Sequence, residues 1–207
     1  MAAAPHINPE RSLRTDHLTR EDLASALSAS EVEVADFFGS LTSDELVLRV
    51  EGAWTAAEQL AHLNTVVSAI AKGFAVPRLV LRLRFGRSRS PGRSHTALRD
   101  EYRALLAAGG RAAGPFVPER HDLTPEQIEA HRGGLLARWG RVNGRLQTAL
   151  GPWGEKDLDT IRLPHPILGK LTAREMIYFT IYHSEHHIAV TKRRLPRLAA
   201  SAGRVVE

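Results

Sequence analysis

The 207-residue sequence contains no cysteine. Disulfide bonds, thiolate nucleophiles and cysteine-based zinc sites are therefore excluded, and any metal ion must be held by His, Asp or Glu. The sequence also lacks an apolar run near the ~20 residues that a membrane-spanning helix needs. Residues 1–7 have no basic flank followed by an apolar segment, unlike a secretory signal. These absences predict a cytoplasmic protein that does not bind a membrane.

The length and composition favour a single domain. Of all residues, 43% are hydrophobic and 25% are charged, which allows a sizeable core. Two domains would each approach the size at which a core becomes marginal. We therefore expect one domain over residues 1–207, with its core at about residues 18–194 and with flexible termini.

Four segments have apolar residues at steps of three and four, which is typical of an amphipathic helix. They are residues 19–41, 55–76, 124–150 and 172–194. Thr55, Thr124 and Thr172 each stand three residues before a Glu or Gln, which is the capping-box pattern of a helix start. We expect the fourth helix to end before Pro196, because proline interrupts the hydrogen bonds of a helix.

Two connections between these segments are predicted to be mostly irregular. Residues 75–123 are rich in Arg, Gly and Pro and contain one expected short helix at 95–108, and residues 157–170 form the second connection. A connection as long as the first permits a crossover between helices of a bundle. It contains six clustered arginines: Arg78, Arg82, Arg84, Arg87, Arg89 and Arg93. Such a cluster is usually a solvated, mobile segment, but it could also attract an anionic substrate or phosphates.

Three histidines have the spacing of a metal site. His183 and His187 are four residues apart on the fourth helix, a spacing of ~400° and ~6 Å that places both rings on one face. His62 lies in the middle of the second helix, among apolar residues. Three imidazoles would leave a fourth position open for water or substrate. A lone buried histidine with a hydrogen bond, or a chance pair on a helix surface, would explain the same residues.

Three further residues are candidates around this site. His186 is ~100° from His187 around the helix, so only one of them faces inward, and the spacing favours His187. Glu58 stands one turn before His62 and could accept a proton or bind a metal, although its place in the capping box already explains it. His165, between two prolines, could reach the mouth of the site or be merely solvated.

Three sequence elements resemble motifs of the DinB/YfiT-like metalloenzyme superfamily, which is unrelated to the polymerase that shares the DinB name. They are Trp54-Thr-Ala-Ala-Glu-Gln-Leu-Ala-His62-Leu, His165-Pro-Ile-Leu-Gly-Lys-Leu-Thr-Ala-Arg-Glu175 and His183-Ser-Glu-His-His187. They occur in the family's order and extend over most of the chain. The resemblance implies an all-α, up-down-down-up four-helix bundle, here with a long Arg-rich crossover. It also implies a zinc, nickel or similar divalent ion held by His62, His183 and His187.

The resemblance also implies a function. Better-understood relatives are thiol-dependent S-transferases and a maleylpyruvate isomerase, which use low-molecular-weight thiols. We therefore expect a metal-dependent thiol transferase or hydrolase with a role in stress or detoxification, and with Glu58 and His165 as candidate catalytic residues. Its partner would be a small molecule, anionic if the arginines contribute.

Other functions stay open at this level. One is a non-catalytic, stress-associated binding protein whose metal is structural or absent. Nucleic-acid binding is disfavoured, because no aromatic residues interleave with the clustered arginines and no base-reading module is recognisable. A homodimer is compatible with the sequence but is not indicated by any motif.

Overall fold

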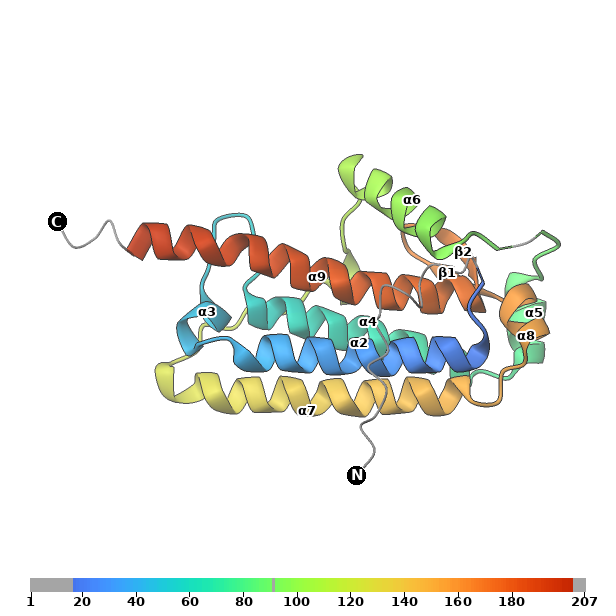
Figure 1. The fold of residues 1–207 in the computed structure, drawn as a ribbon, viewed down its shortest axis with the longest axis horizontal. Coiled ribbons are helices and arrows are strands. Elements are labelled where there is room, and N and C mark those ends of the chain that lie inside the picture. Colours follow the sequence, from blue (N-terminus) through green and yellow to red (C-terminus); the bar gives the residue numbers. More distant parts are fainter. Residues whose placement is uncertain (1–16, 91, 203–207) are drawn as a thin grey trace, which may run out of the picture.

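The computed structural model describes residues 17–90 and 92–202. Four long helices lie side by side along the longest axis of the molecule (Figure 1). They are α2 (Arg20–Ser40), α4 (Ala56–Ala75), α7 (Pro125–Leu150) and α9 (Ala173–Ala202). Helix α4 packs against α7 and α9, and α2 packs against the same two helices. The colours in Figure 1 show that α2 and α9 run in one direction and that α4 and α7 run in the opposite direction.

The predicted helix starts are confirmed by hydrogen bonds between side chains and backbone. At the start of α4, Thr55 N donates to Glu58 Oε2 at 2.8 Å, and Glu58 N donates to Thr55 Oγ1 at 3.1 Å. At the start of α9, Thr172 N donates to Glu175 Oε2 at 2.7 Å, and Glu175 N donates to Thr172 Oγ1 at 3.2 Å. Each box gives partners to backbone N–H groups that a helix leaves unpaired at its first turn. The local sequence therefore fixes where both site-bearing helices begin.

Apolar side chains from all four long helices form one continuous core. The largest completely buried side chains include Trp139, Trp153, Tyr178, Phe38 and Leu60. Burial of such large apolar groups is the main source of stability in a helical fold. It also fixes the rotation of α4 and α9, and thereby determines which of their residues face each other.

The connection between α4 and α7 contains more helix than we expected. Besides the predicted short helix, which is α6 (His95–Ala107), it contains α5 (Arg78–Phe85) and the 3₁₀ helix η1 (Gly114–Phe116). The prediction of irregular structure was wrong for α5. Only Leu81 of α5 is buried, and the helix packs against the strand β1 (Arg162–His165). One buried leucine gives no periodic signal, so this helix depends on a tertiary contact.

The second connection is also more regular than predicted. It contains helix α8 (Glu155–Thr160), after which β1 pairs antiparallel with β2 (Gly169–Thr172). The expectation of an irregular segment is therefore wrong, although the chain is mostly helical as predicted. Each strand has only four residues, too few for a clear alternating pattern. Gly169 closes the hairpin with a φ of 75°, a backbone conformation that suits glycine.

The ends of the described chain add one correction. Helix α9 continues through Pro196 to Ala202, so the predicted end near Arg194 is wrong. Proline removes one backbone hydrogen bond, but its fixed φ is compatible with a helix. A further short helix, α3 (Ser43–Val47), lies between α2 and α4. Of the termini expected to be flexible, residues 1–16 and 203–207 lie outside the described ranges, whereas residues 195–202 belong to α9.

Two properties of the helices in residues 17–90 and 92–202 bear on a membrane span, namely their length and their composition. None of these helices combines the length and the apolar content that a bilayer span requires.

Candidate metal centre

The three predicted histidines converge between α4 and α9. His183 Nε2 lies 3.3 Å from His62 Nε2 and 3.0 Å from His187 Nε2. Within the described part of the chain, these residues form a group whose ligand atoms all lie within 4.8 Å of one another. The helical spacing of His183 and His187 and the position of His62 on its own helix predicted this convergence; the binding of an ion stays a prediction.

The positions of the protons make this cluster suitable for a cation. His62 Nδ1 donates to the backbone oxygen of Phe116 at 2.6 Å, and His187 Nδ1 donates to Gln59 Oε1. With the proton on Nδ1, a neutral imidazole has its lone pair on Nε2, directed into the cluster. Nitrogen ligands about 2.0–2.1 Å from a tetrahedral ion lie roughly 3.3 Å apart, close to the two distances from His183 Nε2 to the other rings. The residues therefore fit a divalent ion such as zinc or nickel.

Burial keeps these imidazoles neutral. Desolvation lowers the pKa of His62 from its usual value. It lowers the pKa of His183 and His187 well below that value, and the neighbouring imidazoles add to the effect. A metal ion binds only the neutral form of histidine, and protons compete with it for the ring nitrogen. The cluster is thus in its ligand form at neutral pH.

Three residues that support the cluster were not predicted. Gln59 and the backbone of Phe116 orient two of the rings, as described above. Trp54 stacks on His187, with ring centroids 6.5 Å apart and 9° between the planes, and lies 5.0 Å from the ring of His62. Gln59 stands three residues before His62 on the same helix face, which is a usable sequence signal. Phe116 contributes a backbone oxygen, for which no sequence signal exists.

A cavity of about 280 Å³ adjoins the cluster. His62 and His183 line it, whereas His187 does not, so the cluster is approached from one side. The remaining lining is apolar apart from His165 and Tyr102, and it comes from α4, α6, α9, the hairpin and the segment before α7. No carboxylate and no arginine is among the described residues that line it. The site therefore combines nitrogen ligands with an apolar chamber.

His165 is one of the predicted candidates that reach this cavity. Its Nδ1 accepts hydrogen bonds from the backbone nitrogens of Ile167 at 3.2 Å and Leu168 at 2.9 Å. Burial lowers the pKa of His165 to about 4, with Arg93 contributing, so the ring is neutral. Because Nδ1 accepts, the ring carries its proton on Nε2. His165 thus closes the hairpin and places an imidazole with one N–H group in the cavity wall.

Two other candidates lie outside the cavity. Glu58 binds the start of its helix and accepts a hydrogen bond from Arg49 Nη2 at 2.9 Å. His186 is half-buried beside Tyr102 and Tyr182, and it does not belong to the group of converging nitrogens. The structure thus places Glu58 in its capping role and His186 outside both the converging group and the lining of the cavity.

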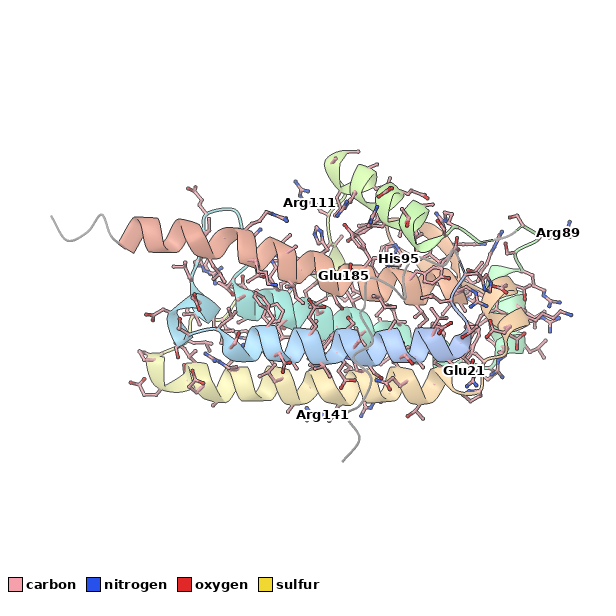
Figure 2. All side chains as sticks on the ribbon, viewed as in Figure 1. Glu21, Arg89, His95, Arg111, Arg141 and Glu185 are labelled. Carbon is pink, nitrogen blue, oxygen red and sulfur yellow. The ribbon has the colours of Figure 1, made fainter. Side chains whose placement is uncertain are left out.

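The clustered arginines do not line the cavity near the histidines. Arg78 pairs with Asp157, and Arg93 pairs with Glu101 and Glu175. The other four arginines of the cluster are exposed. Arg89 lies at the end of the molecule formed by α5 and α8 (Figure 2). The lining of the cavity therefore gives this cluster no contact with a substrate held there.

Comparison with known proteins places these features in a family context. The family model described as the DinB superfamily matches residues 26–190, which include all three converging histidines. No curated protein and no solved structure matches the chain.

Proposed function

This chain belongs to the DinB superfamily, and we propose that it is a metal-dependent enzyme that transfers a low-molecular-weight thiol to a small, apolar electrophile. One observation carries the proposal: three neutral imidazoles converge beside an apolar cavity whose described lining contains no carboxylate. Its scaffold would be an up-down-down-up four-helix bundle, which the directions and contacts of the long helices support. Removal of electrophiles by thiol transfer would give the protein a role in detoxification.

The residues of the centre have separate tasks in this proposal. A divalent ion at three neutral ligands would lower the pKa of a bound thiol or water and so supply a nucleophile at neutral pH. Gln59 and the backbone oxygen of Phe116 hold two ligands in the required tautomer. Trp54 covers the cluster beside His187, so a substrate approaches through the apolar cavity.

The missing carboxylate favours thiol transfer over hydrolysis. Metal-dependent peptidases of the zincin type use a glutamate beside the ion as the general base that activates water. The described lining of the cavity has no such group, and the carboxylate of Glu58 is occupied by Thr55 and Arg49. A free thiol has a pKa near ~8.5, against ~15.7 for water, so it ionises without a carboxylate base.

The cavity also supports a class of acceptor. About 280 Å³ of mainly apolar space suits the carbon skeleton of a small neutral molecule better than a multiply charged one. His165 adds a neutral N–H donor in the wall, which suits a carbonyl oxygen of the acceptor. An activated carbonyl compound or an unsaturated ketone combines both features.

The test is a reaction screen with the metal-loaded protein. Low-molecular-weight thiols are incubated with small aromatic or unsaturated electrophiles, and the thioether product is measured by mass spectrometry. We expect product formation by the wild type and by His121→Ala, which removes an exposed histidine outside the cavity. We expect none with His183→Ala, which removes the central ligand.

Two other outcomes would replace the proposal. Hydrolysis of simple esters at a rate independent of thiol would indicate a hydrolase. For the alternative of a non-catalytic protein, cobalt-substituted protein is titrated with thiol or azide. A visible spectrum that does not change, together with no turnover, would show a closed and structural metal site.

A further inference from the structure

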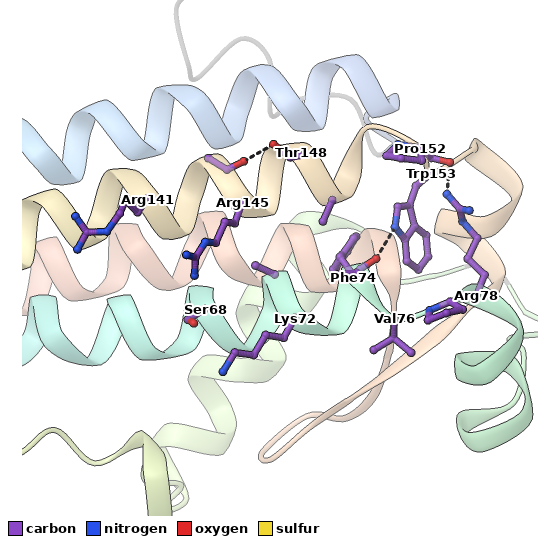
Figure 3. Close-up of a pocket in the computed structure, with 15 residues that line it drawn as sticks. Ser68, Lys72, Phe74, Val76, Arg78, Arg141, Arg145, Thr148, Pro152 and Trp153 are labelled. Atoms are coloured by element: carbon purple, nitrogen blue, oxygen red, sulfur yellow. Dashed lines mark hydrogen bonds between the residues drawn. The ribbon is translucent and has the colours of Figure 1, made fainter.

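A second concavity lies on the other side of α4, between α4 and α7 (Figure 3). This outer groove has a volume of about 690 Å³. Ser68 and Lys72 of α4 line it, whereas Ile70 and Gly73 of the same helix line the cavity near the histidines. The two concavities share no lining residue. Helix α4 therefore separates two independent spaces.

One end of the outer groove is cationic. Figure 3 shows Lys72, Arg141 and Arg145 at this end, with Ser68 between α4 and α7. All three cationic residues are exposed, and none forms a hydrogen bond or ion pair with another described residue. No acidic residue is among the described lining of the groove. Cations that lie close together without a counter-charge repel one another, and a bound anion relieves this repulsion.

The other end of the groove is apolar. Phe74, Val76 and the ring of Trp153 lie there in Figure 3. Trp153 Nε1 donates to the backbone oxygen of Phe74 at 3.2 Å, so the polar atom of the ring already has a partner. Arg78 stacks over the Trp153 ring at 5.2 Å and pairs with Asp157 at 3.3 Å. The positive charge of Arg78 is therefore compensated. Phe74 and Trp153 are themselves buried, so the apolar surface open to a ligand at this end comes from Ala75, Val76 and Pro77.

Small residues along the groove leave it open. Ala71, Ala75 and Ala149 line it together with Gly144. A Cβ atom built on Gly144 would meet no atom within 4 Å. The groove is thus a channel with a charged end and an apolar end, and its volume is within the range of roughly 300–1,000 Å³ typical of small-molecule sites.

We propose that the outer groove binds a carboxylate carried on an apolar chain. The carboxylate lies beside Lys72, Arg141 and Arg145, and the chain extends towards Trp153. Guanidinium groups pair with carboxylates through two parallel hydrogen bonds, which suits the two arginines one turn apart. A polyanion such as a nucleic acid would leave the apolar end uncovered, whereas a fatty acid fills both ends. This site requires neither the metal ion nor the proposed thiol transfer.

The test measures binding of dodecanoate to the metal-free, full-length protein by calorimetry, below the micelle concentration. We expect saturable binding of one molecule per chain, weakened roughly tenfold or more by the double variant Arg141→Gln/Arg145→Gln, because hydrogen bonds to charged groups contribute strongly. Arg138→Gln removes an exposed arginine of α7 outside the groove and should leave binding unchanged. Equal binding by the double variant and the wild type would overturn the proposal.

Two ligand controls separate the charged and apolar contributions. Dodecanol lacks the charge and inorganic phosphate lacks the chain, so both should bind at least roughly tenfold more weakly than dodecanoate. If either bound equally well, the site would not recognise an amphipathic anion. Binding to anionic vesicles without binding to monomeric dodecanoate would indicate a membrane surface as the ligand, and would also overturn the proposal.

A steric control locates the ligand. Gly144 lines the groove and has open space at its Cβ position, so Gly144→Leu should place a side chain in the groove and abolish dodecanoate binding. Gly134→Leu makes the same change at an open, exposed position of α7 outside the groove and should not affect binding. Circular dichroism on both variants verifies the fold. Unchanged binding by a folded Gly144→Leu variant would show that dodecanoate binds elsewhere.

Discussion

The two sides of α4 carry opposite chemistry. One side directs His62 and Gln59 into a buried centre whose adjoining cavity has no charged residue among its described lining. The other side directs Lys72 to an exposed groove shared with Arg141 and Arg145. Imidazole can lose its charge when it is buried, whereas guanidinium cannot. One helix can therefore serve a buried site with neutral ligands and a solvated site with permanent charges.

The largest expected effect is the loss of metal binding in a His183 variant that still binds dodecanoate in the outer groove. His183 contacts both other ligands, so His183→Ala should reduce the bound metal from about one ion per chain to near zero. Metal content is measured by plasma mass spectrometry, and dodecanoate binding is measured on the same sample. If a folded His183→Ala variant lost dodecanoate binding as well as the metal ion, the two sides of α4 would not be independent.

The next comparison is between adjacent histidines of α9. His187→Ala should abolish metal binding, whereas His186→Ala should leave most of it, because only His187 directs Nε2 towards His183. The i,i+4 pair diverges by ~40° around the helix and the i,i+3 pair by ~60°. Metal titrations of both purified variants decide the assignment. Equal loss in the two variants would contradict it.

Removal of a supporting residue should weaken the centre without abolishing it. Gln59→Ala leaves the Nδ1 proton of His187 without its acceptor, and the loss of such a partner typically costs 10–100-fold in metal affinity. Competition with a chelator of known affinity gives the ratio. The matched control is Gln147→Ala on α7, which removes a glutamine that binds Glu31 outside the centre. An equal loss in the control would indicate a general effect on the fold.

A smaller effect is expected at Glu58. Its carboxylate caps α4 and contacts Arg49 but does not line the cavity. Glu58→Ala removes the hydrogen bonds to Thr55 and Arg49. It should lower the free energy of unfolding by about 1 kcal/mol and leave metal content and thiol transfer unchanged. Urea denaturation and the thioether assay measure the two quantities. A large loss of turnover at unchanged metal content would restore Glu58 as a catalytic residue.

The smallest expected effect is a change in stability. It tests whether Gly144→Leu blocks the outer groove without damaging the fold. Gly134→Leu and Gly144→Leu both replace an exposed helical glycine at a site with room for a side chain. Each should raise the free energy of unfolding by roughly 0.5–1 kcal/mol, because leucine has the higher helix propensity. Thermal denaturation checks this. If only Gly144→Leu were destabilised, its loss of dodecanoate binding would be explained by damage to the fold and not by a blocked groove.

Local sequence predicted the parts of this protein that depend on local interactions. Capping boxes at Thr55 and Thr172 gave the starts of both site-bearing helices, because their hydrogen bonds join residues three apart. The spacing of His183 and His187 placed both rings on one face, because helical geometry alone decides this. The place of His62 among apolar residues of the second helix added it to the pair, and the family motif implied the same three residues.

Only the tertiary structure decided which of these faces meet and what surrounds them. The hairpin and α5 are too short to have a reliable periodic signal, and both depend on packing against the rest of the chain. The partner of His62 is a backbone oxygen of Phe116, 54 residues away, and a backbone oxygen exists at every residue. The outer groove brings Lys72 of α4 together with Arg141 and Arg145 of α7. Of the six arginines clustered in the sequence, only Arg78 lines the groove, and none lines the cavity near the histidines. Side chains distant in the sequence form a site only when buried apolar faces bring their helices together, and that depends on the packing of the whole core.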